Sequence, residues 1–178
     1  MKTIQTKKIV LTALFTALIT VATLFIRVPL PLGYVNLGDA FILLSVFILG
    51  PLYGTIASAT GSAIADLIGY AAYAPGTLII KGLMALTASL IYTAIYSAAK
   101  KSLLAEIVAG IVGALIMSFG YFLYETLLFT TAAVAIINVP YNLIQGGLGV
   151  AIAAAAMRVL IPTKIIEKLN GDVKEKNN

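Results

Sequence analysis

The chain has no cysteine, no histidine and no tryptophan among its 178 residues. The absence of cysteine excludes disulfide bonds and thiol chemistry, and the absence of histidine removes the commonest general base and metal ligand. Charged side chains make up only 11% of the residues, whereas hydrophobic ones make up 61%, and the mean hydropathy is +1.04. A soluble domain of this length does not need so much apolar material. The sequence therefore predicts an all-α integral membrane protein that forms a single membrane domain over residues 1–178.

Glycine and proline divide the apolar sequence into runs. We predict membrane-spanning helices at about residues 9–26, 39–50, 52–69, 77–97, 104–129 and 138–160. The boundary between the second and third helices depends on Gly50 and Pro51, because no charged side chain occurs from Ala40 to Ala65. That stretch could form one long span with a kink at Pro51, or two shorter spans that turn there. Proline removes a backbone donor and glycine is a common helix terminator, so the local sequence permits both.

The distribution of positive charge distinguishes the two topologies. The net charge is +5, and the cations lie at the ends of the apolar runs, which fits a membrane protein better than a nucleic-acid-binding protein. With six spans, one side of the membrane would hold Lys2, Lys7, Lys8, Lys100, Lys101, Arg158, Lys164, Lys168, Lys174 and Lys176. The other side would hold Arg27, with Lys81 just inside the fourth span. Because Lys and Arg accumulate on the cytoplasmic side, we predict a six-transmembrane-helix bundle with both termini cytoplasmic.

Charged side chains inside the predicted spans indicate a polar site. The six-span topology places Asp39, Asp66, Lys81 and Glu125 in the outer half of the membrane. An ionised group at mid-bilayer costs about 2.5–3.5 kcal/mol on insertion scales, so such groups usually face a cavity or a partner. We interpret the cluster as an outward-facing pocket for a small, flat, polar molecule. Two structural alternatives remain open: Asp39 could cap the second span, and Lys81 could snorkel or pair with Asp66.

Four short motifs, in this order, resemble a known family. They are an Ala-x-x-x-Ala pair (Ala13, Ala17), a Gly-Asp at the start of the second span (Gly38, Asp39), a Gly-Pro-x-x-Gly turn (Gly50, Pro51, Gly54) and an Asn-x-x-Gln (Asn142, Gln145). Together with the size and the six-span topology, they are similar to the substrate-binding S component of an energy-coupling-factor (ECF) vitamin transporter. The resemblance covers about residues 5–162.

The resemblance implies a fold, a function and a set of partners. It implies a subunit that captures a vitamin from outside and docks through its first span, at Ala13 and Ala17, onto a transmembrane coupling subunit driven by two cytoplasmic ATPases. The loop over residues 27–38 would close over the site. The ligand-binding candidates that it implies are Tyr34, Asn36, Asp39, Lys81, Tyr121, Glu125, Asn142 and Gln145. The lack of tryptophan and histidine argues against thiamin as the ligand. The sequence as a whole most resembles the family's pyridoxine or hydroxymethylpyrimidine binders, and after them its riboflavin binders.

Other classes of protein fit the sequence less well. An intramembrane aspartyl protease needs a Gly-x-Gly-Asp context, and Asp39 follows Asn36-Leu37-Gly38 instead. A serine mechanism lacks its histidine, no metal-ligand cluster exists, and no catalytic residue or cofactor is predicted. The sequence has no Gly-x-x-x-x-Gly-Lys-Ser/Thr loop, so any coupling to ATP must come from partner subunits. A standalone small carrier or a structural membrane subunit remains the alternative, although no inverted repeat is visible.

Overall fold

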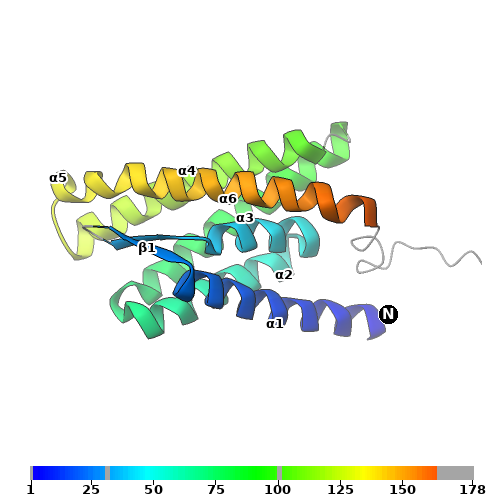
Figure 1. Cartoon of the computed structure of the whole chain (residues 1–178), viewed down its shortest axis with the longest axis horizontal. Coiled ribbons are helices and arrows are strands. Elements are labelled where there is room, and N and C mark those ends of the chain that lie inside the picture. Colours follow the sequence, from blue (N-terminus) through cyan, green and yellow to red (C-terminus); the bar gives the residue numbers. More distant parts are fainter. Residues whose placement is uncertain (1, 31–32, 100–101, 164–178) are drawn as a thin grey trace, which may run out of the picture.

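The computed structural model describes residues 2–30, 33–99 and 102–163, and for residues 2–4, 29, 30, 33 and 34 it describes the backbone only. Long helices run roughly along one axis (Figure 1). The elements are α1 (Lys2–Phe25), β1 (Arg27–Leu30), β2 (Gly33–Asn36), α2 (Gly38–Gly69), η1 (Ala71–Tyr73), α3 (Ala74–Ala99), α4 (Ser102–Leu128), α5 (Ala132–Ala135), η2 (Ile136–Asn138), α6 (Val139–Leu160) and η3 (Ile161–Thr163).

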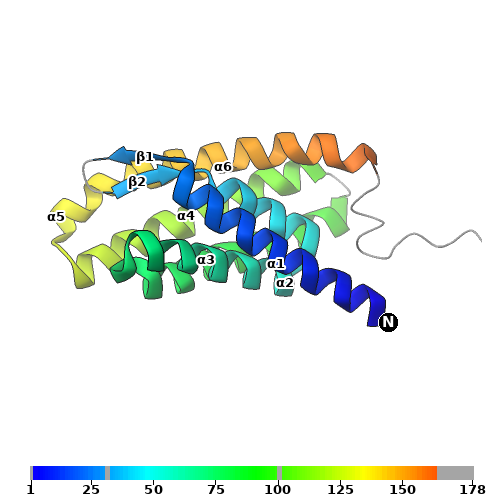
Figure 2. The same cartoon turned by 60° about the horizontal axis from the view of Figure 1, so that its bottom comes forward.

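The bundle has two distinct ends. The strands β1 and β2, together with α5, lie at one end, which we call the hairpin end (Figures 1 and 2). The start of α1, the start of α4 and the end of α6 lie at the opposite end, which we call the Gly50 end for the turn described below. Five helical segments among the described residues are long and apolar enough to cross a membrane: residues 5–25, 38–69, 71–99, 102–128 and 132–163. These segments confirm the prediction of an all-helical membrane domain.

The first half of α2 is the centre of the molecule. Helix α2 packs against α1, α3 and α6, and its residues from Ile42 to Leu49 are all buried. A helix that is surrounded by other helices has no polar face to present, which explains why this segment is hydrophobic on every side. The remaining helices instead expose large apolar side chains outward, such as Ile79 on α3 and Phe119 on α4. Such an apolar outer surface is suited to contact with the lipid of a membrane.

The chain reverses direction inside α2, at Gly50. This residue has φ +77° and ψ −174°, a conformation outside the helical region, and Pro51 follows it. The hydroxyls of Ser45 and Ser58 lie 3.1 Å apart, whereas 13 residues of straight helix would separate them by about 20 Å. Gly54 makes the close approach possible, because a Cβ there would lie 2.6 Å from the Cα of Val46. Helix α2 therefore consists of two arms that pack side by side.

The segment between α1 and α2 differs from its prediction. Residues 27–38 were expected to form a proline- and glycine-rich loop, but they contain an antiparallel hairpin in which Arg27 pairs with Asn36 and Val28 with Val35. Pro29 is compatible with this arrangement because a two-stranded hairpin has only edge strands, where a missing backbone donor is tolerated. Lys100, Lys101 and the lysines after residue 163, on which the predicted orientation depends, lie outside the described residues.

We predict that Gly50→Ala destabilises the protein through the backbone alone. A Cβ at Gly50 would meet no atom within 4 Å, so the cost arises from a φ that side chains rarely adopt, about 1–3 kcal/mol. Thermal unfolding in detergent measures the change. The matched control is Gly147→Ala, which also meets no atom within 4 Å but lies within α6, where alanine is the better helix former. Equal melting temperatures for the two variants would contradict the strained turn.

Candidate functional site

A buried carboxylate, Asp39, joins three helices near the hairpin end. It lies in the first turn of α2, and the ammonium group of Lys81 on α3 forms an ion pair with its Oδ1. Gln145 on α6 donates from Nε2 to Oδ2 of the same carboxylate over 2.8 Å. Asp39 is 0% exposed, and Lys81 and Gln145 are each 4% exposed. Both carboxylate oxygens are therefore satisfied inside the bundle without water.

Gln145 also holds the strand hairpin in place. Its Oε1 accepts hydrogen bonds from the backbone N–H of Asn36, over 2.9 Å, and from the side-chain amide of Asn36, over 3.2 Å. The other end of the Asn36 amide, Oδ1, accepts from the backbone N–H of Gly38 over 2.8 Å. One glutamine side chain thus connects the hairpin, α2 and α6.

The polar network continues from Lys81 along α3 and α4. The ammonium group contacts the sulfur of Met117 and lies 5.6 Å from the ring centroid of Tyr121, within the range of a cation–π interaction. The Tyr121 hydroxyl lies 2.9 Å from that of Thr77, which in turn donates to the carboxylate of Asp66. A continuous chain of polar contacts therefore links Asn36 to Asp66 through the interior.

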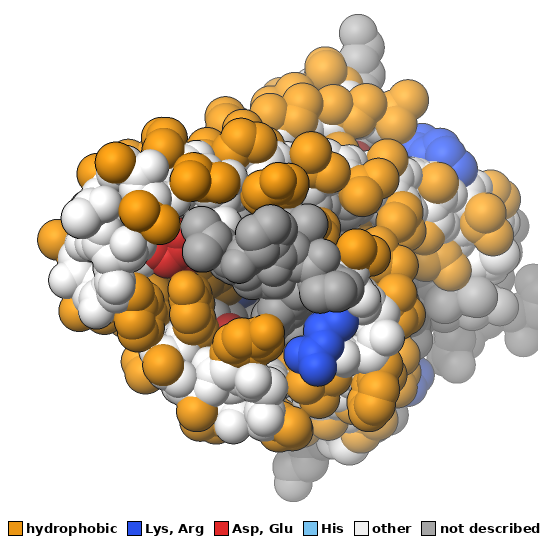
Figure 3. All heavy atoms as spheres, turned by 60° about the vertical axis from the view of Figure 1, so that its left-hand side comes forward, with side chains coloured by type: hydrophobic (Ala, Val, Ile, Leu, Met, Phe, Trp, Pro, Cys, Tyr) orange, Lys and Arg blue, Asp and Glu red, His pale blue; other side chains and the backbone are white. Residues whose placement is uncertain are grey.

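A second polar pair lies closer to the surface of the hairpin end. Glu125, in the last turn of α4, accepts a hydrogen bond of 2.8 Å from the side-chain amide of Asn138. Next to it the rings of Tyr73 and Phe129 stack at 5.0 Å, and Tyr124 packs against both. Figure 3 views this end and shows acidic side chains in hollows between hydrophobic ones. Aromatic rings beside amides and a carboxylate are suited to a flat polar ligand.

Comparison with known proteins identifies the family. Residues 3–164 match the family described as "ECF-type riboflavin transporter, S component". The chain belongs to this family. A solved structure titled "Structure and mechanism of the S component of a bacterial ECF transporter" has the same fold, with a TM-score of 0.69, 22% identity, and coverage of 90% of this chain and 99% of that one.

One curated relative is also similar. An uncharacterized protein in a "gap 3'region" of Pyrococcus woesei is 48% identical over 66 residues. That alignment covers 36% of this chain and 45% of the relative, so the chain matches less than half of the relative's length.

The family confirms the predicted class of protein. S components are binding subunits rather than enzymes, they are multi-pass membrane proteins, and they work with an ECF module of membrane and ATPase subunits. The predicted preference for pyridoxine or hydroxymethylpyrimidine has no support in the family match, whose description names riboflavin.

The structure brings most of the predicted site residues of this S component together. Asn36, Asp39, Lys81, Tyr121 and Gln145 belong to one connected network.

The three other ligand-binding candidates and the two docking residues lie outside that network. Glu125 belongs to the separate pair with Asn138. Asn142, half-buried on α6, makes no hydrogen bond with the described residues. The backbone of Tyr34 lies in β2, and its side chain is outside the description. Ala13 and Ala17 are exposed on the outer face of α1.

Two alternative roles considered for the charged residues are wrong. Lys81 does not pair with Asp66 but with Asp39, and Asp66 accepts the hydroxyl of Thr77 instead. Asp39 does not cap α2 either, because the N-cap position is Leu37 and the first backbone N–H of the helix, at Gly38, donates to Asn36. The carboxylate points across to α3 and α6, since Lys81 and Gln145 supply stronger, charge-assisted or buried partners.

Sequence reasoning missed two members of the network, Thr77 and Met117. A signal for each was present, because residues four apart share a helix face. Thr77 precedes Lys81 by four residues, and Met117 precedes Tyr121 by four.

We predict that Asp39→Asn destabilises this S component more than its small change in shape suggests. It leaves the ammonium group of Lys81 buried without its counter-ion, which costs about 3–5 kcal/mol for buried pairs. The double variant Asp39→Asn with Lys81→Met removes both charges and should recover most of that loss. Thermal unfolding in detergent compares the variants. A wild-type melting temperature for Asp39→Asn alone would show that the pair does not stabilise the bundle.

Proposed function

We propose that this S component is the high-affinity riboflavin-binding subunit of an ATP-driven ECF importer in a bacterial-type plasma membrane. The observation that carries the proposal is the family match, which extends over residues 3–164. The site at the hairpin end supports it. There the chain offers tyrosine rings and several amide side chains close together.

Riboflavin suits the chemistry of this end. Its ring system is flat and carries a polar edge that alternates hydrogen-bond donors and acceptors, which amide side chains can complement. Asn142 and Gln145 lie on one face of α6, and Asn142 has no hydrogen-bond partner among the described residues. We retain as ligand-binding candidates Tyr34, Asn36, Asp39, Lys81, Tyr121, Glu125, Asn142 and Gln145.

Their roles in binding differ. Asp39 and Lys81 form the buried base of the site, where they pair with one another. Their role is to position Gln145, which donates to Asp39, and they keep their ion pair when the ligand binds. Gln145 and Asn36 bond to each other in this structure, and a ligand that takes one of these bonds replaces an existing contact. Because that exchange involves Asn36, entry of the vitamin is coupled to the position of the hairpin.

We predict that Asn142→Ala weakens riboflavin binding without destabilising the protein, whereas Gln145→Ala weakens both. Loss of a hydrogen bond in a buried site costs about 1–3 kcal/mol, which is roughly fivefold or more in affinity. Quenching of riboflavin fluorescence measures affinity, and thermal unfolding measures stability. Ile144→Ala, on an outward-facing position of the same helix, is the matched control and should change neither.

Competition distinguishes the vitamins. Unlabelled pyridoxine and hydroxymethylpyrimidine should fail to displace bound riboflavin at concentrations where riboflavin itself does. If pyridoxine binds tightly and riboflavin does not, the substrate proposed here is wrong although the family assignment stands.

We also propose that each arm of α2 crosses the membrane, giving six spans with both termini cytoplasmic. The chain has no cysteine, so single introduced cysteines report accessibility cleanly. We predict that an impermeant thiol reagent labels Thr131→Cys in intact cells, and labels Lys7→Cys and Leu52→Cys only after permeabilisation. All three positions are exposed, and Leu52 follows the turn at Gly50. If α2 crossed only once, Leu52→Cys would lie within the membrane and would resist labelling from both sides.

The outward face of α1 supports docking of the coupling subunit at Ala13 and Ala17. Both methyl groups are exposed, while Phe15 and Ile19 on the other side are buried. Neighbouring Thr20 donates to the backbone carbonyl of Gly61, so that side of α1 already packs against α2. Small residues at this spacing allow close approach of a partner helix in lipid.

We predict that Ala17→Trp abolishes vitamin uptake by the complete transporter but leaves riboflavin affinity of the isolated subunit unchanged. The indole ring would hold a docked helix away by several ångströms, on the order of the side chain's own size. Co-purification with the coupling subunit reports docking directly. Leu115→Trp, at an exposed position on α4, is the control and should transport normally. Loss of riboflavin binding in Ala17→Trp would instead assign this face to the internal structure.

A further inference from the structure

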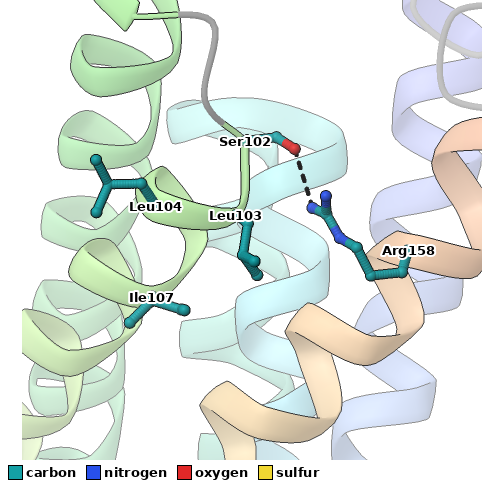
Figure 4. Close-up of a pocket in the computed structure, with 5 residues that line it drawn as sticks. All are labelled: Ser102, Leu103, Leu104, Ile107 and Arg158. Carbon is teal, nitrogen blue, oxygen red and sulfur yellow. Dashed lines mark hydrogen bonds between the residues drawn. The ribbon is translucent and has the colours of Figure 1, made fainter.

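An open groove lies at the Gly50 end, between the start of α4 and the end of α6. It is lined by Ser102, Leu103, Leu104, Ile107 and Arg158. Figure 4 shows the guanidinium group of Arg158 pointing from α6 toward Ser102 on α4. The leucine and isoleucine side chains, which are about half exposed, form the apolar wall on the α4 side. The groove therefore combines an apolar wall with a polar, cationic rim.

The guanidinium group is fixed on one side and open on the other. Its Nη2 donates to the carboxylate of Glu106 and, over 2.9 Å, to the hydroxyl of Ser102. Its Nε and Nη1 groups contact no acceptor within residues 2–30, 33–99 and 102–163. Glu106 is 0% exposed, whereas the side chain of Arg158 is 43% exposed. The groove surface therefore presents the positive charge and not the carboxylate beneath it.

We propose that this groove binds one anionic phospholipid, with its phosphate on Arg158 and an acyl chain along Leu103, Leu104 and Ile107. Arginine donors in a planar fork match the oxygens of a phosphate group. Cationic pockets between transmembrane helices at the membrane surface bind anionic lipid headgroups. Helix α4 starts at Ser102, so the positive end of its dipole adds positive potential at the same place.

The position of the groove favours a lipid over a soluble anion or a protein segment. Arg158 lies in the last turn of α6 and Ser102 at the first residue of α4, which puts both at the end of a membrane-spanning helix. Val159, next to Arg158, is 70% exposed, so the surface around the groove stays apolar, as lipid contact requires. The pair with Glu106 holds the guanidinium in one orientation, which lowers the entropy lost on binding.

The test measures lipid binding to the purified full chain in neutral detergent. Native mass spectrometry and thermal unfolding compare phosphatidylglycerol with phosphatidylcholine of the same acyl chains. We expect preferential retention of one phosphatidylglycerol and an increase in melting temperature with this lipid only. Soluble glycerol phosphate should reproduce neither effect, because it lacks the acyl chain.

The variants separate the groove from general surface charge. The double variant Glu106→Gln with Arg158→Gln removes the cation without leaving a buried carboxylate unpaired, and it should lower the phosphatidylglycerol preference about fivefold or more. Lys7→Gln, which removes an exposed cation on α1 at the same end, should leave the preference almost unchanged. Leu103→Trp fills the groove and retains the ion pair, so it provides a second test if the double variant does not fold.

Three outcomes would overturn the proposal. Equal binding of both lipids by the wild-type protein would show that the groove does not select a headgroup. An unchanged preference in both the double variant and Leu103→Trp would place the lipid elsewhere. A loss of association with the ECF module, with lipid binding intact, would assign the groove to a protein partner. Riboflavin affinity, measured in parallel, should be normal in every variant, because the groove lies at the opposite end from the vitamin site.

Discussion

The ion pair between Asp39 and Lys81 is the contact on which the hairpin end depends. Both groups are almost completely buried inside the helical bundle, so neither is tolerated without the other. Because Asp39 starts α2 and Lys81 lies on α3, the pair fixes the register of these helices. Its second oxygen fixes Gln145, and Gln145 fixes the hairpin. A single electrostatic requirement thus determines the position of four elements.

This arrangement solves a problem that every membrane binding protein has when its site is empty. Polar groups that will contact a ligand must not remain unsatisfied inside an apolar bundle, because each buried unpaired group costs free energy. Here the polar side chains of the network bond to one another. Asn142, which lies outside this network, is half-buried and makes no hydrogen bond with the described residues. Ligand binding at such a site is an exchange of partners, and selectivity arises from how well the ligand replaces those bonds.

Hydropathy predicted the helices well, because lipid imposes one strong rule on every span. The predicted span 77–97 lies inside α3, and 138–160 corresponds to α6 within one residue. The turn at Gly50 was recognisable because glycine and proline act through the local backbone. The strands β1 and β2 were not predicted, since Pro29 and the surrounding glycines are typical of loops. The contact that attaches β2 to α6, between Asn36 and Gln145, joins residues 109 positions apart, which no local pattern reveals.

The partner of Lys81 could not be derived from the sequence for the same reason. Asp39 and Asp66 are both carboxylates at similar predicted depth, and only helix packing decides which one lies opposite the ammonium group. The sequence contained the set of polar residues that form the site, but not their connections. Helical periodicity alone could have predicted only the pairs of network residues that are four apart, such as Thr77 and Lys81.

Two ion pairs among the described residues, Asp39 with Lys81 and Glu106 with Arg158, differ in how much of their charge reaches the surface. At the hairpin end both partners are buried, so their charges cancel inside the bundle. At the Gly50 end only the acid is buried, and its partner Arg158 remains 43% exposed. Lys7 and Lys8 on α1 lie at the same end. The surface at the Gly50 end is therefore cationic. The topology proposed above places this end on the cytoplasmic side, where anionic lipids attract it. In that topology the hairpin end faces outward. Because the charges of Asp39 and Lys81 cancel there, we propose that hydrogen bonding and ring stacking select the ligand.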